Sequence, residues 1–130
     1  MSEDTAASLP SERRGMDVQS FLLGFANHLK YSLSKDRYSA SEYDRFTALC
    51  LAVRDRAIER WIETQQSYHR QNVKRVYYLS MEFLLGRSLL NNLVNLGVDK
   101  ICREGVERLG HDWEKLQDIV KDLDLSRYIL

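Results

Sequence analysis

Residues 74–97, with the sequence KRVYYLSMEFLLGRSLLNNLVNLG, decide the fold expected for this chain. Residues 76–79 (VYYL) form a short unbroken run of β-branched, aromatic and aliphatic side chains, which is typical of a strand covered on both faces. Glu82 follows, then a glycine that can turn freely, and then Ser88, which can cap a helix over residues 89–96. The order predicted here is strand, acid, turn and helix.

Glu82 is the first candidate site residue. Ligands of open α/β sheets bind outside the carboxyl ends of the strands, and Glu82 stands at that end of the predicted strand. A simpler interpretation is that Glu82 pairs with Arg87 or caps a backbone turn. The residues alone leave both interpretations open.

Two helices are predicted upstream. Apolar residues recur at three- and four-residue steps over residues 17–33, and residues 35–38 (KDRY) break the pattern. A longer helix over residues 41–69 begins at an approximate capping box of Ser41 and Asp44. At 1.5 Å per residue this helix spans about 43 Å and must extend beyond its own core. The side of this helix that is expected to be buried consists of Phe46, Leu49, Cys50, Val53, Ala57, Trp61, Gln65 and Tyr68. Most of its charged residues are expected to face solvent, and these are Asp55, Arg56, Glu59, Arg60 and Glu63.

Two shorter helices are predicted downstream. Residues 98–109 form one amphipathic pattern that Gly110 closes, and residues 113–123 form another. The expected fold class is therefore mainly α, a helical bundle with one short β-strand.

The composition fits a single domain and excludes several classes of partner. The chain has 130 residues, with 19 basic and 19 acidic side chains and no net charge, so it offers no electrostatic footprint for nucleic acid or an anionic membrane. No stretch approaches the ~20 apolar residues of a membrane span, which predicts a cytoplasmic protein. Residues 1–15 are polar and are expected to form a mobile tail.

Neither cysteine nor histidine suggests a metal centre. Cys50 and Cys102 lie at apolar positions of separate predicted helices, where a free thiol behaves as a small hydrophobic side chain. His28, His69 and His111 are far apart, and no spacing typical of metal ligands gathers them.

The central stretch resembles the early strand and helix of the α-glucan phosphorylases, the family of glycogen, starch and maltodextrin phosphorylases. Residues 53–80 (VRDRAIERWIETQQSYHRQNVKRVYYLS), 28–37 (HLKYSLSKDR) and 107–116 (ERLGHDWEKL) extend the resemblance to roughly residues 21–116. It implies that residues 16–130 are the incomplete amino-terminal part of a phosphorylase α/β domain of the GT-B type. After Leu116 the sequence departs from the family pattern, which favours a fragment or a truncated product.

The resemblance implies a parent enzyme that cleaves α-1,4-glucan with phosphate to give glucose 1-phosphate. Such enzymes hold pyridoxal phosphate on a lysine, and the cofactor supplies the acid and base. Neither that lysine nor the substrate-phosphate residues match positions of this sequence. Of the family's active-site contacts only Glu82 matches, as a hydrogen-bonding residue of the pocket. The chain alone is therefore expected to bind no cofactor and to be inactive.

The resemblance also implies a nucleotide effector site. Asp36, Gln65 and Gln66 match the family's effector-binding residues, whereas His69 stands where a tyrosine stacks on adenine and Tyr38 stands where a small amide is usual. Stacking on a base contributes about 1 to 3 kcal/mol in other nucleotide-binding sites, so its loss should weaken binding about tenfold or more. Little control by AMP is expected.

Two kinds of partner follow from the resemblance. The corresponding family region lies at the dimer interface, so a homo-oligomer through the 35–38 loop and the long helix is expected. The alternative is a stand-alone helical interaction module that pairs with a phosphorylase subunit.

Overall fold

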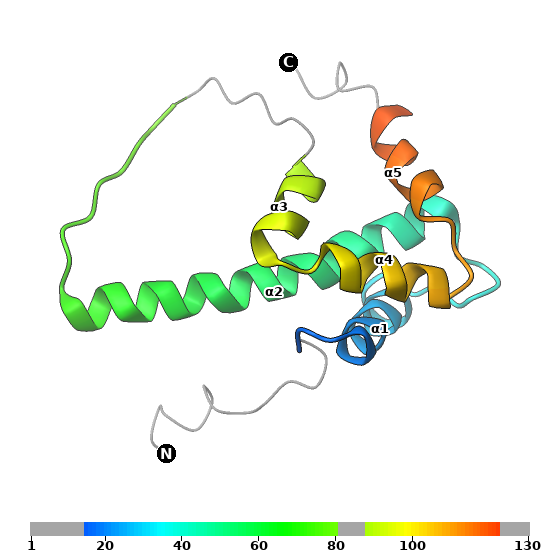
Figure 1. Ribbon diagram of the computed structural model, residues 1–130, viewed down its shortest axis with the longest axis horizontal. Helices are drawn as coiled ribbons and strands as arrows, with labels where there is room; N and C mark the ends of the chain where they lie inside the picture. Colours follow the sequence, from blue (N-terminus) through cyan, green and yellow to red (C-terminus); the bar gives the residue numbers. More distant parts are fainter. Residues whose placement is uncertain (1–14, 81–87, 123–130) are drawn as a thin grey trace.

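The computed structural model describes residues 15–80 and 88–122, and this part of the chain is mainly helical, as predicted (Figure 1). The predicted tail lies outside the described residues except for Gly15. The elements in chain order are α1 (Val18–Asn27), the π-helical turn η2 (His28–Ser32), α2 (Glu42–Gln71), α3 (Ser88–Leu96), α4 (Asp99–Arg108) and α5 (Trp113–Asp122).

The first predicted helix is present as α1 and η2. Asp17 caps α1, since its Oδ1 accepts a hydrogen bond of 2.9 Å from the backbone N–H of Ser20, which satisfies one of the donors left free at a helix start. The chain then continues into η2, whose last bond runs from the N–H of Leu33 to the carbonyl of His28 at 3.0 Å. The helix therefore extends as far as the sequence predicted, but its last turn is π-helical.

The long helix is confirmed as α2, which has 30 residues and the predicted capping box of Ser41 and Asp44. It ends at Gln71, and the residue after it, Asn72, caps the helix with a left-handed φ of 47°. The buried residues of α2 all lie in its first half and are Ala48, Leu49, Ala52, Val53 and Arg56. Figure 1 shows that the second half of α2 projects beyond the other helices.

Part of the predicted buried side of α2 is wrong. Trp61 is 62% exposed and Tyr68 is 44% exposed, because the shorter helices pack against the first half of α2 only (Figure 1). The opposite error occurs at Arg56, which was expected to face solvent and is 2% exposed. Helical periodicity alone does not reveal where the covering elements end.

The core joins α1, α3, α4 and α5 to the first half of α2. A close approach brings α1 and α4 together at Gly105, where an added methyl would lie 2.6 Å from Cε1 of Phe21. Only glycine leaves room for the Phe21 ring at this crossing. The buried cluster consists of Phe21, Phe25, Ala48, Leu49, Ala52, Val53, Leu93, Val98, Cys102, Val106, Trp113 and Leu116.

The strand predicted at residues 76–79 is not present. Residues 73–80 have no regular secondary structure, and the part of the chain that the structure describes contains no strand. Val76 is 85% exposed and Leu79 is 92% exposed. A strand needs neighbours that accept its backbone hydrogen bonds and cover its faces, and the described residues supply neither.

The downstream helices are confirmed as α3, α4 and α5. Gly110 closes the α4 segment in the left-handed region, with φ of 78°, which favours glycine. Asp112 then caps α5 by accepting a 2.9 Å bond from the N–H of Glu114. The predicted end of this last helix at Leu123 lies outside the described residues.

Candidate functional site

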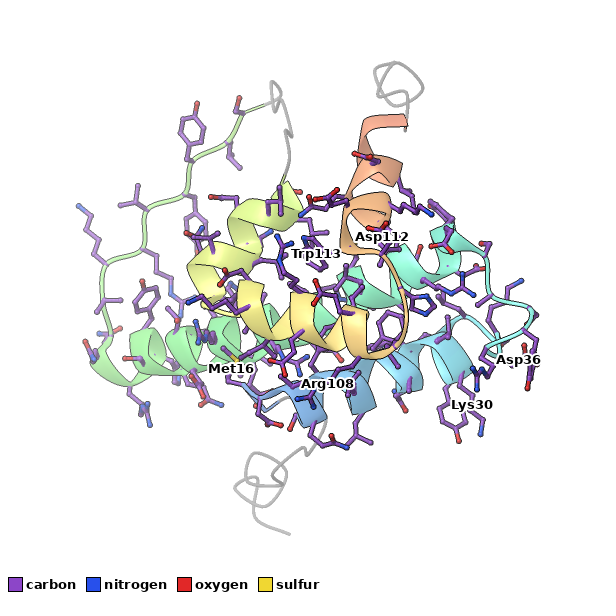
Figure 2. The ribbon with its side chains drawn as sticks, turned by 45° about the vertical axis from the view of Figure 1, so that its right-hand side comes forward. Met16, Lys30, Asp36, Arg108, Asp112 and Trp113 are labelled. Atoms are coloured by element: carbon purple, nitrogen blue, oxygen red, sulfur yellow. The ribbon has the colours of Figure 1, made fainter. Side chains whose placement is uncertain are left out.

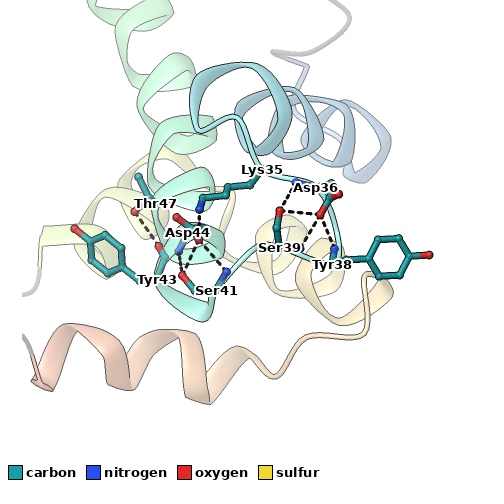
Figure 3. Close-up of polar contacts among 8 residues, drawn as sticks. All are labelled: Lys35, Asp36, Tyr38, Ser39, Ser41, Tyr43, Asp44 and Thr47. Carbon is teal, nitrogen blue, oxygen red and sulfur yellow. Dashed lines mark hydrogen bonds and ion pairs between the residues drawn. The ribbon is translucent and has the colours of Figure 1, made fainter.

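The loop before α2 is shaped by Asp36 (Figure 3). Oδ1 of Asp36 accepts bonds from the N–H of Tyr38 at 2.9 Å and of Ser39 at 2.6 Å, and from the Ser39 hydroxyl at 2.8 Å. The hydrogen bonds from Ser39, followed by the bond from Tyr38, hold the pKa of Asp36 below its ordinary value of 3.8. The carboxylate matched to an effector contact is therefore also a structural part of its own loop.

A second reciprocal pair follows directly. Oδ2 of Asp44 accepts bonds from the N–H of Ser41 at 2.9 Å and from its hydroxyl at 2.7 Å, while the N–H of Asp44 donates to Oγ of Ser41 at 3.2 Å. The bonds from Ser41 also lower the pKa of Asp44. Two consecutive motifs thus fix the backbone between Asp36 and Asp44 (Figure 3).

The tip of this loop projects a basic and an aromatic side chain. Tyr38 is 88% exposed, and Cζ of Arg37 lies 5.7 Å from the centre of its ring. Figure 3 shows Tyr38 pointing away from the ribbon. A rigid backbone therefore presents Arg37 and Tyr38 to solvent.

The other predicted effector residues lie at the far end of α2. Gln65 is half-buried, and Gln66 and His69 are exposed. At roughly 1.5 Å per residue, His69 lies about 40 Å along the axis from the start of α2, whereas Asp36 precedes that start (Figure 2). One copy of the chain does not bring Asp36 and His69 together. Glu82, the predicted pocket contact, lies outside the described residues.

A histidine contact that sequence reasoning missed joins η2 to α2. Nε2 of His28 lies 2.8 Å from Oδ2 of Asp55, and Nδ1 lies 2.9 Å from Oγ of Ser32. The spacing of His28 and Ser32 fits adjacent turns of a helix, but nothing in the sequence pairs His28 with Asp55. This contact ties the end of the first helical segment to the long helix.

Arg56 is the second residue that sequence reasoning misplaced. Its Nε and Nη2 donate to the carbonyl of Gly15 at 3.2 and 3.0 Å, and its Nη1 donates to the carbonyl of Ala52 at 2.7 Å. Burial lowers the pKa of its guanidinium. Arg56 thus fixes the entry of α1 against the buried face of α2.

The thiols and lysines of the described residues offer little for covalent chemistry. Cys50 and Cys102 are unbridged, and burial raises the pKa of Cys50 to about 11 and of Cys102 to about 12. Among the described residues, Arg56 is the only charged side chain that is buried. The described residues also contain no group of three His, Cys, Asp or Glu side chains that could hold a metal.

No described helix is long and apolar enough to cross a membrane.

No protein-family model matches the chain. Individual proteins do match it, and strongly. Human glycogen phosphorylase, brain form, is 46% identical over 110 residues, which is 85% of this chain and 13% of that protein. Bovine glycogen phosphorylase, liver form, is 48% identical over 103 residues, 79% of this chain and 12% of that protein. The rat brain form is 46% identical over 110 residues, again 85% and 13% of the two chains.

These identities and the helical fold define a segment of an α-glucan phosphorylase. The chain belongs to that family, and the relatives it matches are glycogen phosphorylases. It spans 12 to 13% of the length of these relatives.

Proposed function

We propose that the chain is the amino-terminal segment of a cytoplasmic enzyme that degrades glycogen or a related α-glucan to glucose 1-phosphate. The observation that carries the proposal is 46% identity over 85% of the chain with a glycogen phosphorylase. In the parent, pyridoxal phosphate would be bound by residues outside the segment that this chain represents. The segment would contribute scaffold, one pocket contact and part of an effector site.

The pocket contact proposed for the parent is Glu82. Val76, Tyr77, Tyr78 and Leu79 are 76 to 92% exposed in this structure, a large apolar surface for a soluble chain to leave uncovered. In the parent these residues would pair as a strand within a larger sheet. Glu82 would then follow the carboxyl end of that strand, where α/β sheets bind ligands.

A chimeric enzyme tests this function. The segment of human brain-form glycogen phosphorylase that matches this chain is replaced by the present sequence, and release of glucose 1-phosphate from glycogen and phosphate is measured. We expect an active chimera with bound cofactor. A folded, cofactor-loaded chimera without activity would contradict the proposal.

The Glu82→Gln variant of the chimera tests the pocket assignment. Loss of one charge-assisted hydrogen bond in a pocket costs about 1.5 to 3 kcal/mol, which corresponds to a rate reduced roughly 10- to 100-fold. Cofactor absorbance should not change. Exposed Glu107 provides the matched control, and Glu107→Gln should leave the rate unaltered.

The effector residues and the expected homo-oligomer are proposed together. Gln65, Gln66 and His69 would form one half of a nucleotide site, and the 35–38 loop would come from a second copy. This arrangement is proposed because α2 separates the two halves by about 40 Å within one chain. Association through the loop and α2 would place Asp36 of one copy beside His69 of the other.

The alternative is an interaction module that pairs with a separate phosphorylase subunit. The exposed second half of α2 and residues 73–79 favour it, because both offer apolar surface that nothing described covers. Purified chain would then form a stable complex with intact glycogen phosphorylase in size-exclusion chromatography. Elution as separate species at micromolar concentrations would rule it out.

A further inference from the structure

Ser32, His28 and Asp55 form a continuous chain of hydrogen bonds that the proposed function does not use. Nδ1 of His28 lies 2.9 Å from Oγ of Ser32, and Nε2 lies 2.8 Å from Oδ2 of Asp55. A hydroxyl, an imidazole and a carboxylate in this order are the parts of a serine nucleophile with its base and the group that orients the base. Such sets recur on unrelated folds, so geometry and roles identify them.

The carboxylate of Asp55 decides where the protons of the cluster lie. An ionised carboxylate only accepts hydrogen bonds, so Nε2 of His28 is the nitrogen that carries a proton. In the neutral imidazole Nδ1 then has a free lone pair, and it accepts the O–H of Ser32. Many serine enzymes use the two ring nitrogens in the opposite order, but either nitrogen can accept a proton from a hydroxyl.

The imidazole is sheltered and held from both sides, while the hydroxyl is open to solvent. The side chain of His28 is 13% exposed, and Ser32 is exposed. Ser32 lies on the same π-helical turn as His28, whereas Asp55 comes from α2. Because both ring nitrogens have partners, little orientational freedom must be lost when a proton moves from Ser32 to Nδ1.

The backbone after Ser32 limits the esters that could react with it. The N–H groups of Leu33 and Lys35 already donate to the carbonyls of His28 and Leu29, each at 3.0 Å. These two groups therefore cannot stabilise the oxyanion that forms when a hydroxyl adds to a carbonyl, a contribution that is usually large. The reaction then depends on the base, which favours esters with a good leaving group, such as aryl esters.

We propose that Ser32 is an activated nucleophile that accepts the acyl group of an aryl ester. Oγ of Ser32 adds to the carbonyl carbon while its proton passes to Nδ1 of His28, and the carboxylate of Asp55 stabilises the imidazolium. The bond between the carbonyl carbon and the aryl oxygen then breaks, and the departing aryl oxide takes the proton from Nδ1. The products are acylated Ser32 and a phenol, and His28 is neutral again.

Incubation of the purified chain with p-nitrophenyl acetate, followed by peptide mass spectrometry, tests the site. An acetyl group should appear on Ser32 and should be released by alkaline hydroxylamine, which cleaves esters but not lysine amides. Since general-base assistance contributes roughly 10²- to 10⁴-fold, Ser32 should react at least about 100 times faster than Ser39. Ser39 is the internal control, because it is also exposed and its hydroxyl donates directly to the carboxylate of Asp36 at 2.8 Å.

Variants of the cluster test the role of each residue. His28→Gln keeps a hydrogen-bonding side chain without a base and should slow acetylation of Ser32 roughly 100-fold. Asp55→Asn should also slow it and Asp55→Glu should restore it, because the carboxylate fixes the proton on Nε2. His111→Gln is the matched control at a half-buried histidine outside the cluster, and it should leave the rate unchanged. Circular dichroism verifies that each variant keeps its helix content.

The comparison of Ser32 with Ser39 needs no variant, so it decides the proposal even if a substitution disturbs the fold. Acetylation of Ser32 that is no faster than that of Ser39 would overturn the proposal. An undiminished rate in folded His28→Gln would do the same, because the hydroxyl would then react without its base. Neither result bears on the proposed phosphorylase function, which assigns no role to Ser32 or His28.

Discussion

Arg56 shows that a charged side chain can occupy the buried face of a helix. It is surrounded by charged neighbours in the sequence, yet its guanidinium is buried and donates to the carbonyls of Gly15 and Ala52. These bonds satisfy the donors of a buried guanidinium, which would be costly to leave unpaired. Helical spacing does place Arg56 on the buried stripe, four residues after Ala52 and seven after Leu49. The spacing does not reveal the carbonyl of Gly15, the distant partner that receives two of its hydrogen bonds.

The variant Arg56→Lys should lower the free energy of unfolding by about 1 to 3 kcal/mol, since an ammonium lacks the planar fork with which the guanidinium reaches both carbonyls. Urea unfolding followed by circular dichroism measures the change. Arg54→Lys makes the same exchange at an exposed position of the same helix and should have almost no effect. Equal effects of the two variants would show that the carbonyl contacts add nothing to stability.

His69 permits a direct test of the effector assignment. A tyrosine at this position would supply a ring for stacking, so His69→Tyr should tighten AMP binding about tenfold. The measurement is titration calorimetry with AMP. His111→Tyr serves as the control because residue 111 lies outside the assigned site. No gain in affinity would remove His69 from the effector site.

At the scale of elements, the sequence predicted helices far better than the strand. The capping box of Ser41 and Asp44 and the left-handed Gly110 are local, and each was found where the pattern placed it. A helix satisfies its backbone within itself, whereas a strand depends on neighbours elsewhere in the chain. The pattern at residues 76–79 indicates that the segment can form a strand within a sheet, but the described residues contain no sheet.

The capping carboxylates give the chain a pH dependence. The pKa values of Asp17, Asp36 and Asp44 lie below their ordinary 3.8, chiefly because of hydrogen bonds from nearby serines. Carboxylates with a depressed folded pKa stabilise the fold above about pH 4, and this contribution is lost as the pH falls through the folded value. Acid should therefore weaken the start of α1 and of α2.

The variant Asp44→Asn should flatten the loss of stability below about pH 4, because the variant has no carboxylate to protonate. Thermal unfolding at several pH values measures this. Glu107→Gln removes an exposed carboxylate of α4 and should keep the wild-type slope. An acid limb that is the same in Asp44→Asn and wild type would exclude the capping box as its source.

At the scale of the whole molecule, the structure is a helical core with an extension. The sequence predicted that α2 would extend beyond the core it packs against, and the last buried residue of α2 is indeed Arg56. The predicted length of about 43 Å already places Asp36 and His69 at opposite ends of this helix, so the division of the candidate site within one chain follows from the sequence. Positions along the chain were predictable, but contacts between distant positions, such as His28 with Asp55, were not.

The uncovered segment 73–79 gives the last prediction. Tyr77 is 76% exposed between Val76 and Tyr78, which are also exposed, and an extended apolar segment with unpaired backbone groups invites edge-to-edge association. The purified chain should form species larger than the proposed homo-oligomer as its concentration rises. Tyr77→Lys should suppress them, because a charge at the edge opposes strand pairing.

Light scattering distinguishes this association from the homo-oligomer proposed above. Tyr77→Lys should lower the average mass to that of the homo-oligomer and no further. Helix content should stay constant throughout, since residues 73–80 lie outside every helix. If Tyr77→Lys instead unfolds the helices, Tyr77 belongs to a closed core, and the exposed segment is not the source of association.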